Sequence, residues 1–330
     1  MINEVANMWK ARTWMKNNVP FLYSWHAYVG FELNLFEAFK RPVRIEDVSD
    51  AYDLEIELLE QWVEVGIALK HLKRDERSRV KIVRAWKLPG ANNGSPSSGD
   101  LLKEMMELHI PSLLSYPELM KNKSRHHFNS EKHAPTVAKT STLLELLAFR
   151  IIDRNVKQHK ISTILDIGCG EGGYLIKLAK KYKEIDLVGV EINEDVAQSA
   201  AEAAQPYDNV EIVHSDIENY KPDRFFDYVM VNNLLHYFDP EERKAFFSRL
   251  HNVVSHNGIV TIISPLQKAK HGQQFSSAFN SFFLTFDNLY PVPSEKELRE
   301  LVKKAGFKVK NVSAIIREGG WFIVKIQKQA

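Results

Sequence analysis

Ile164-Leu-Asp-Ile-Gly-Cys-Gly-Glu-Gly172 is the stretch that decides the fold of this chain. The apolar run Thr163–Ile167 has the composition of a buried parallel strand, and Tyr174–Lys183 repeats its apolar residues with helical spacing. Between them, closely spaced glycines allow a ligand to approach the backbone, and the start of the helix offers free N–H groups. The stretch therefore predicts a strand, a turn and a helix that together hold a nucleotide-like ligand.

The acidic residues of this stretch discriminate between two classes of ligand. Gly168, Gly170 and Gly173 also fit the spacing G-x-G-x-x-G of dinucleotide sites. Asp166 and Glu171 flank the turn, however, and carboxylates at that distance would repel a pyrophosphate. A ligand that carries an ammonium and a sulfonium would be attracted instead. We therefore expect S-adenosylmethionine rather than NAD as the cofactor.

The residues after the turn alternate between strand and helix patterns. Strands are expected at Asp186–Glu191, Asn209–His214, Phe226–Val231, Gly258–Ser264, Phe307–Ala314 and Trp321–Gln327, and helices at Asn193–Ala204, Asp239–Ser255 and Ser294–Ala305. This alternation predicts an α/β fold, with a mostly parallel sheet covered by helices on both faces. A short turn at Arg317–Gly320 joins the last two strands, which predicts an antiparallel pair at one edge. Ser294 and Glu297 have the spacing of a capping box.

Over residues 140–330 the sequence resembles the class I S-adenosylmethionine-dependent methyltransferases, which have a Rossmann-like sheet. The resemblance rests on four motifs in the family's order and spacing, namely Leu165–Gly172, the strand that ends at Glu191, Ser215-Asp216-Ile217 and Asp227–His236. It implies that Asp166, Gly168 and Gly170 line the methionine end of the cofactor. It also implies that Glu191 binds the ribose, Asp216 and Ile217 the adenine, and that Asn232 lies beside the cofactor. We include Cys169, Ile192 and Asn233 in the same candidate cofactor-binding set.

His236 is the candidate catalytic residue. It follows the fourth strand at the carboxyl edge of the sheet, where open α/β folds bind their ligands. It also matches the catalytic histidine of the plant-type O-methyltransferases, whose His-Asp-Trp motif corresponds to His236-Tyr237-Phe238 here. In the family, two acidic residues support this histidine. The corresponding positions here are Ser264 and a position near Val292, so neither acid is matched. His236 therefore has two interpretations, a general base or a structural residue that lines the pocket.

The segment Gln267–Pro293 lies where the family places acceptor-binding residues. It contains six aromatic residues and no lysine after Lys270, which predicts an apolar pocket lined by aromatic side chains. Phenylalanines with helical spacing, such as Phe279, Phe282 and Phe283, are also typical of a hydrophobic core. We expect O-methylation of a small, fairly apolar acceptor, with N- or C-methylation of a similar molecule as the nearest alternative.

Residues 1–100 are expected to form a separate, mainly helical domain. Helices are predicted at Val19–Lys40, Ile45–Tyr52 and Asp53–His71, and two short strands at Val80–Val83 and Trp86–Leu88 are predicted to form a wing. Leu35–Phe39, Ile45–Ser49 and Leu58–Leu72 resemble the N-terminal winged-helix domain of small-molecule O-methyltransferases. The resemblance implies a homodimer whose N-terminal domain helps to close the acceptor pocket.

A winged helix also suggests a DNA-binding regulator that keeps the methyltransferase sheet as a ligand sensor. The helix that would enter the groove carries five acids, Asp53, Glu55, Glu57, Glu60 and Glu64, before its first lysine, Lys70. Helices that read a groove need cationic and amide side chains, and an acidic helix would be repelled. We therefore expect no nucleic-acid partner, and the regulator remains the alternative of a different class.

Length and composition set the remaining expectations. A chain of 330 residues is long enough for two domains. We predict them as residues 1–100 and 101–330, with the boundary at the end of the flexible loop Pro89–Asp100. Residues 101–158 are expected to be linker helices, at Leu101–Lys121 and Thr136–Val156, around the basic, solvated stretch Lys121–Phe128. The net charge of +2 gives no reason to expect a polyanionic partner.

The cysteine, histidine and apolar patterns bear on location and on metals. Cys169 is the single cysteine, which excludes an intramolecular disulfide and fits a cytoplasmic protein, and a small packing residue is its simplest interpretation. Met1–Lys10 lacks the apolar run of a signal peptide, and no stretch has the roughly twenty apolar residues of a membrane span. His126, His127 and His133 lack acidic or thiol companions at ligand spacing, so no metal site is expected.

Overall fold

The computed structural model describes residues 2–90 and 97–329. The chain forms two compact units, Met1–Pro111 and Ser112–Ala330, and each is described by itself. Among the described residues, none of the helices combines the length and the apolar character that crossing a lipid bilayer requires.

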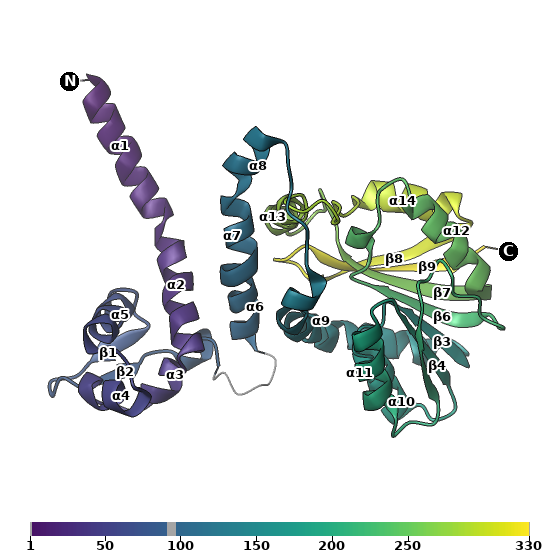
Figure 1. Cartoon of the computed structure of the whole chain (residues 1–330), viewed down its shortest axis with the longest axis horizontal. Helices are drawn as coiled ribbons and strands as arrows, with labels where there is room; N and C mark the ends of the chain where they lie inside the picture. The colour runs from purple at the N-terminus through teal and green to yellow at the C-terminus, as the bar shows by residue number, and fades with distance from the viewer. Residues whose placement is uncertain (1, 91–96, 330) are drawn as a thin grey trace. The chain divides into compact units, whose positions relative to one another are not determined.

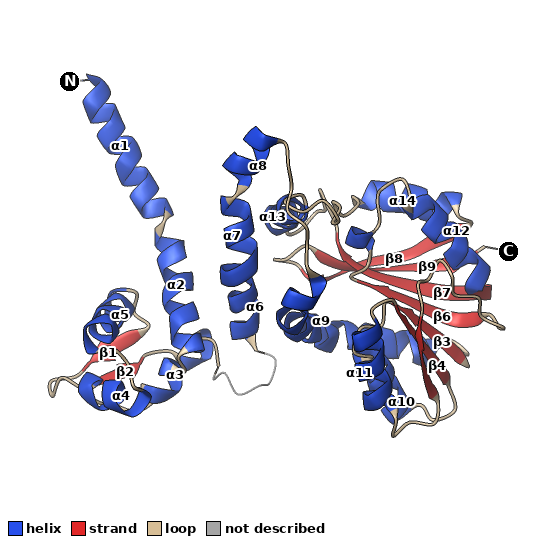
Figure 2. Ribbon diagram, in the orientation of Figure 1, coloured by secondary structure: helices blue, strands red, loops and turns tan. Residues whose placement is uncertain are grey.

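The second unit is built on a seven-stranded sheet with the order β5-β4-β3-β6-β7-β9-β8 (Figure 2). Its strands are β3 (Thr163–Ile167), β4 (Asp186–Glu191), β5 (Val210–His214), β6 (Phe226–Asn232), β7 (Val254–Pro265), β8 (Phe307–Ile316) and β9 (Trp321–Lys328). The pairs from β5 to β7 are parallel, whereas β9 is antiparallel to both β7 and β8. The predicted sheet, with its antiparallel pair at one edge, is therefore confirmed.

Helices cover both faces of this sheet (Figure 1). The helices of this unit are α8 (Tyr116–Asn122), α9 (Ser130–Gln158), α10 (Gly173–Lys181), α11 (Glu194–Ala204), α12 (Arg243–Val253), α13 (Gln273–Phe283) and α14 (Glu295–Lys304). One core joins the sheet to α12 and α14, and a second joins it to α9 and α10. Because both faces are covered, most residues of the central strands β3 and β6 are buried, and most of them are apolar.

The ends of several predicted elements move for local reasons. Strand β7 begins at Val254 rather than Gly258, because Val254 already pairs with Phe226. Helix α12 begins at Arg243, four residues after the predicted start at Asp239. The capping box at the start of α14 is present, since Ser294 and Glu297 exchange hydrogen bonds between side chain and backbone.

The first unit is mainly helical. It contains α1 (Ile2–Asn17), α2 (Val19–Glu32), α3 (Leu35–Ala38), α4 (Ile45–Tyr52), α5 (Ile56–Ala68), β1 (Leu72–Arg74), β2 (Val80–Ile82), α6 (Ser98–Glu104) and a π-type turn at Met105–His109, after which α7 (Ile110–Leu114) begins. The predicted helix Val19–Lys40 is interrupted at Asn34, whose φ of 55° is left-handed. Helix α1 was not predicted, and its described side chains are exposed.

The wing of the first unit corrects one prediction. Strand β2 pairs with β1 (Leu72–Arg74), whereas the predicted partner Trp86–Leu88 overlaps a 3-10 turn at Ala85–Lys87. The Asp75 carboxylate accepts the backbone N–H groups of Arg77 and Arg79, and this closes a tight turn directly after β1. Leu72 and Val80 are then buried on one face of the hairpin. The side chain of an exposed aspartate, rather than the apolar pattern, sets the strand pairing here.

Candidate active site

The glycine turn after β3 opens onto free space. Gly168, Gly170 and Gly172 have φ values of 67°, 53° and 73°, a backbone region that side chains rarely adopt. A Cβ added at Gly168 would lie 2.8 Å from Leu234 Cδ1, so this side of the turn is packed. A Cβ added at Gly170 would have no described heavy atom within 4 Å. A ligand can therefore approach the backbone closely at Gly170.

Asp166 and Asn232 meet at the carboxyl ends of the neighbouring strands β3 and β6. The Asn232 side chain donates to Asp166 Oδ1 over 3.1 Å. Asp166 Oδ2 and Asn232 Oδ1 are buried and accept no hydrogen bond from the described residues. Burial, together with the negative charges of Glu145 and Glu191, raises the pKa of Asp166 well above its usual value. Two buried acceptors thus remain available to a cationic or N–H-bearing ligand.

Glu145 is a buried carboxylate that the sequence analysis missed. It lies on α9, and its carboxylate is within 3 Å of the position that a Cβ on Gly173 would occupy. Its Oε1 atom lies 2.8 Å from Lys177 Nζ, an ion pair without hydrogen-bond geometry. The available signal was a lone acid among the apolar residues Leu144 and Ala148 of the same helix.

Glu191 ties the end of β4 to the glycine turn. Its Oε2 atom accepts the Gly170 N–H over 3.0 Å, and its Oε1 atom accepts the Asn193 N–H over 3.1 Å. The carboxylate is partly exposed, and each oxygen retains a lone pair for a ligand hydroxyl. Ile192, the next residue, exposes 64% of its surface. The end of β4 therefore offers an acceptor and an exposed apolar side chain next to each other.

Asp216 and Ile217 follow β5 at the same edge of the sheet. The Ser215 N–H donates to the Glu191 carbonyl over 2.9 Å, which fixes this loop to the end of β4. Asp216 Oδ1 accepts the Glu218 N–H over 2.9 Å, and Ile217 packs against the core in a partly buried position. The structure thus brings the predicted residues of β3, β4, β5 and β6 to one edge of the sheet.

Cys169 and Asn233 have side chains with other contacts. A Cβ added at Gly189 would lie 2.7 Å from Cys169 Sγ, so this sulfur packs under the turn. Burial raises the pKa of the Cys169 thiol, which favours an unreactive packing residue. Asn233 Oδ1 accepts the Trp321 indole N–H over 3.0 Å. The Cys169 sulfur and the Asn233 side-chain oxygen are therefore already in contact with other parts of the protein.

His236 lies in a 3-10 turn (Leu235–Tyr237) that follows β6. Its ring stacks on Phe283, with centroids 4.6 Å apart and planes 6° apart. Burial, and then the charge of Arg243, lower the pKa of His236 to about 3. Among the described residues, no carboxylate forms a hydrogen bond with the imidazole. At the two positions where the family has supporting acids, the Ser264 hydroxyl donates to the Pro265 carbonyl and Val292 is a buried apolar residue. The imidazole is therefore neutral and is held by ring stacking rather than by an acid.

Arg243 is a second residue that the sequence analysis missed. Its guanidinium is buried and donates to the Leu235 carbonyl over 3.2 Å and to the Pro291 carbonyl over 2.6 Å. The Tyr290 N–H donates to the His236 carbonyl over 2.8 Å. Arg243 therefore clamps the turn that carries His236 to the segment before α14. An arginine at the start of an ordinary surface helix gives no sequence signal for this role.

The aromatic residues of α13 pack mainly with one another. Phe279, Phe282 and Phe283 are less than 10% exposed, and Phe279 meets Trp321 edge to face with centroids 4.7 Å apart. Phe283 is the member of this group that contacts His236. The helix thus supplies an apolar wall beside the candidate catalytic residue.

Residues 164–258 match a family described as a methyltransferase domain, and this stretch contains the glycine turn and the ends of β3 to β6. The chain contains an S-adenosylmethionine-dependent methyltransferase domain. Its matched residues include Asp166, Glu191, Asp216 and Asn232. They end before β8, β9, α13 and α14 and leave the whole first unit outside.

Curated relatives of this methyltransferase are distant. A carboxy-S-adenosyl-L-methionine synthase of Campylobacter hominis is 23% identical over 188 residues, which cover 50% of this chain and 77% of the relative. An (S)-tetrahydroprotoberberine N-methyltransferase of Eschscholzia californica is 31% identical over 71 residues, 21% of this chain and 20% of the relative.

Solved methyltransferase structures have the same fold over both units. The pyocyanin biosynthetic protein PhzM superposes with a TM-score of 0.76 at 15% identity, covering 97% of this chain and 99% of its own. Human N-acetylserotonin methyltransferase, solved with S-adenosylmethionine, gives 0.76 at 13% identity over 97% and 98% of the two chains. Mitomycin 7-O-methyltransferase MmcR gives 0.76 at 16% identity over 98% and 99%.

Proposed function

We propose that this methyltransferase transfers a methyl group from S-adenosylmethionine to an oxygen atom of a small, fairly apolar acceptor, and that it works as a homodimer in the cytoplasm. The observation that carries the proposal is the pair of buried, unsatisfied acceptors on Asp166 and Asn232, next to a glycine turn that is open at Gly170. A cationic cofactor satisfies both acceptors, whereas an anionic one would not.

The acidic residues around the turn match the charges of this cofactor. S-adenosylmethionine supplies an electrophilic methyl group on a sulfonium, and it also carries an ammonium. We assign Asp166, Gly168, Gly170 and Glu145 to its methionine end, because two buried carboxylates there attract positive charge. Lys177 forms an ion pair with Glu145, but Asp166 has no cationic partner among the described residues.

The ends of β4, β5 and β6 supply the rest of the cofactor site. Glu191 accepts hydrogen bonds from the ribose hydroxyls with the lone pairs that Gly170 and Asn193 leave free. Asp216 and the apolar residues Ile192 and Ile217 bind the adenine. Cys169, Asn232 and Asn233 complete the set, Cys169 and Asn233 through backbone groups and packing.

The acceptor side of the site is apolar, with His236 as its polar group. A neutral imidazole can accept a proton from an acceptor hydroxyl, whereas a protonated one cannot. The stack on Phe283 fixes the ring plane, and Arg243 fixes the backbone of the same turn. The low pKa of His236 limits its strength as a base, so we assign it first to orienting the acceptor hydroxyl and second to proton transfer.

The first unit supports the homodimer. Helix α1 and the start of α2 expose large apolar side chains, among them Met8, Trp9, Trp14, Met15 and Phe21. Exposed apolar surface of this extent favours association with a second copy. The exposed face of α5 is acidic, with Glu57, Glu60 and Glu64, which disfavours a nucleic-acid partner.

The decisive experiment identifies the acceptor and the methylated atom together. Cell extract is incubated with the pure protein and S-adenosylmethionine whose methyl group carries ¹³C, and mass spectrometry reads which small molecule gains the label. Fragmentation or ¹³C NMR of the product then distinguishes a methoxy carbon from an N-methyl or C-methyl carbon. A labelled N-methyl or C-methyl product, or retardation of DNA without any labelled product, would overturn the proposal.

A further inference from the structure

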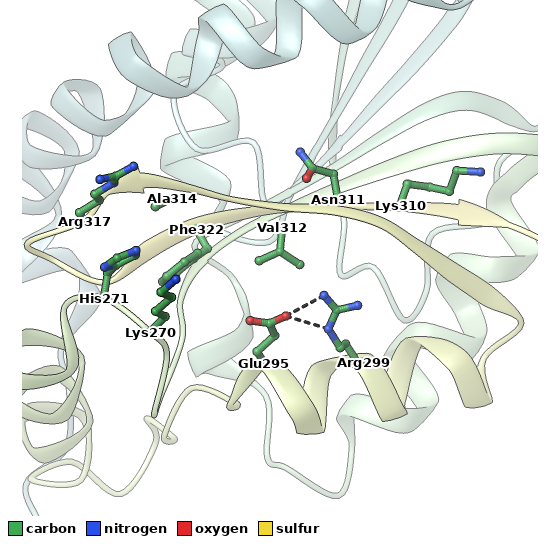
Figure 3. Close-up of a pocket in the computed structure, with 10 residues that line it drawn as sticks. All are labelled: Lys270, His271, Glu295, Arg299, Lys310, Asn311, Val312, Ala314, Arg317 and Phe322. Atoms are coloured by element: carbon green, nitrogen blue, oxygen red, sulfur yellow. Dashed lines mark hydrogen bonds and ion pairs between the residues drawn. The ribbon is translucent and has the colours of Figure 1, made fainter.

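We propose that a groove at the β8 edge of the sheet binds a small phosphate monoester. The groove has a volume of about 470 Å³ and lies between the β8–β9 hairpin, helix α14 and the segment after β7 (Figure 3). This volume is typical of small-molecule sites. None of the residues that line it belongs to the candidate cofactor site, so the proposal is independent of the proposed function.

The groove carries an excess of positive charge. Lys270, Lys310 and Arg317 line it, and none of the three forms an ion pair with a described carboxylate. The lining carboxylate, Glu295, is already paired with Arg299 at 2.7 Å. The charge of the groove is therefore unbalanced, although the whole chain carries only +2. An unbalanced cluster of cations in a concave surface attracts a multiply charged anion.

Three of the polar residues that line the groove belong to its end near the β8–β9 turn. In Figure 3 Lys270 and His271 lie next to each other at the end of the groove near the β8–β9 turn, Arg317 rises from the strand above them, and Lys310 lies toward the other end. The guanidinium fork of an arginine matches two oxygens of a phosphate, and a lysine adds a point charge. A monoester offers three terminal oxygens, which can accept hydrogen bonds from the cationic side chains that line this end of the groove.

The backbone that carries these side chains is fixed before any ligand arrives. Gly272 has a φ of 69°, and a Cβ there would lie 2.1 Å from Gly320 N, so the loop after β7 is pressed against the β8–β9 turn. The Leu266 N–H donates to the Gly320 carbonyl over 3.1 Å, and the Gln267 N–H donates to the Pro293 carbonyl over 3.1 Å. These contacts join all three walls of the groove, and preorganised walls lower the entropic cost of binding.

The floor of the groove is apolar and favours an ester over inorganic phosphate. Val312, Ala314 and the buried side chain of Phe322 lie between the cationic end and the Glu295–Arg299 pair. An organic group attached to the phosphate would cover this floor and remove apolar surface from water. The ligand is therefore inferred to be a small phosphate monoester with an apolar body.

The test is isothermal titration calorimetry with phenyl phosphate, on the full chain saturated with S-adenosylhomocysteine so that the cofactor site is occupied. Phenyl phosphate is expected to bind, and inorganic phosphate at least several-fold more weakly. Arg317→Gln and Lys270→Gln should each weaken phenyl phosphate about tenfold, because each removes a charge-assisted contact. The matched control is Lys308→Gln, since Lys308 is an exposed lysine of β8 that does not line the groove.

Four results would overturn the inference. The first is no heat with phenyl phosphate, and the second is equal weakening by Lys308→Gln and Arg317→Gln, which would mean general surface charge. The third is benzoate binding as tightly as phenyl phosphate, which would assign the groove to carboxylates. The fourth is loss of binding in Glu191→Gln with Arg317→Gln unaffected, which would place the ligand in the cofactor site.

Discussion

Asn232 satisfies one oxygen of Asp166, through an N–H···Oδ1 hydrogen bond of 3.1 Å between neighbouring strands, and leaves the other oxygen unsatisfied. Burial, with the charges of Glu145 and Glu191, raises the pKa of Asp166, so the carboxyl keeps its proton above the ordinary value of 3.8. Without a ligand, the unfolded chain ionises first, and the free energy of unfolding falls as pH rises from 3.8 toward the folded pKa. A bound cation reverses this effect, because it favours the ionised carboxyl.

The affinity for S-adenosylmethionine is therefore expected to increase with pH through the raised pKa of Asp166. Calorimetry between pH 5 and pH 8 measures this increase, and Asp166→Asn should weaken binding and abolish the pH dependence. Asp195→Asn, on the exposed side of α11, is the matched control and should keep both. A pH-independent affinity in the unaltered protein would contradict the assignment of Asp166 to the cationic end of the cofactor.

Glu191→Ala should weaken S-adenosylmethionine binding more than tenfold, because charge-assisted hydrogen bonds to hydroxyls contribute roughly 1.5–3 kcal/mol. The same substitution also removes the acceptor for the Gly170 and Asn193 N–H groups, so part of the loss comes from a looser turn. Thermal unfolding without cofactor measures that part separately. Glu194→Ala, at the first residue of α11, is the control, and equal losses in both variants would remove Glu191 from the ribose site.

Glu145→Gln should weaken the cofactor several-fold at pH 7, because it removes a buried negative charge beside Asp166 and leaves Lys177 without its partner. The substitution preserves the shape of the side chain next to Gly173, so the packing of α9 on α10 is retained. Glu184→Gln changes the same charge at an exposed position and should have no effect. Unchanged affinity in Glu145→Gln would show that this carboxylate serves only the ion pair.

His236→Ala should reduce turnover of a hydroxyl acceptor by at least tenfold and leave cofactor affinity within twofold. Because the pKa of His236 is lowered to about 3, the imidazole stays neutral, and kcat should show no titration of this histidine between pH 5 and pH 8. His236→Asn, which keeps a hydrogen-bonding side chain, should recover part of the activity if orientation is the main role. A sigmoidal rise of kcat near pH 6.5 that disappears in His236→Ala would instead indicate an ordinary, exposed imidazole.

Much of this arrangement could be predicted because it depends on local pattern. In Thr163–Ile167 and the glycines that follow, strand propensity, turn chemistry and helix start all favour the same local structure. The observed strand has the predicted bounds, and helix α10 begins one residue before the predicted start. Ser294 and Glu297 form their capping box because both partners lie within one helical turn. Information within a few residues was sufficient in both cases.

The remaining features depend on contacts between distant segments. Glu145 precedes Asp166 by 21 residues, and only the packing of α9 against α10 brings its charge to the turn. Arg243 joins two loops through carbonyl oxygens, which leave no mark on the sequence. The strand that pairs with β2 was predicted wrongly, because the Asp75 side chain closes the turn before β2 and the apolar pattern does not indicate this hydrogen bond.

A histidine pair in the core of the first unit makes this unit sensitive to acid. His26 is buried and stacks on Trp62, with centroids 4.1 Å apart, and its Nδ1 lies 3.0 Å from the Nδ1 of His71. Burial, and then the charge of His71, lower the pKa of His26 from 6.5 to about 3. As pH falls from 6.5 toward 3, the unfolded chain binds a proton that the folded chain does not, so the free energy of unfolding decreases.

Urea denaturation should therefore show a loss of stability between pH 7 and pH 5, on the order of 1–2 kcal/mol for a histidine that stays neutral in the fold. His26→Phe keeps a ring on Trp62 but cannot bind a proton, so it should have a smaller dependence on pH, even though it loses the contact with His71. His256→Phe, at an exposed position, should retain the full dependence. If His26→Phe and the unaltered protein lose equal stability over this range, proton binding by His26 in the unfolded chain does not cause the loss. The acid sensitivity then arises outside this pair.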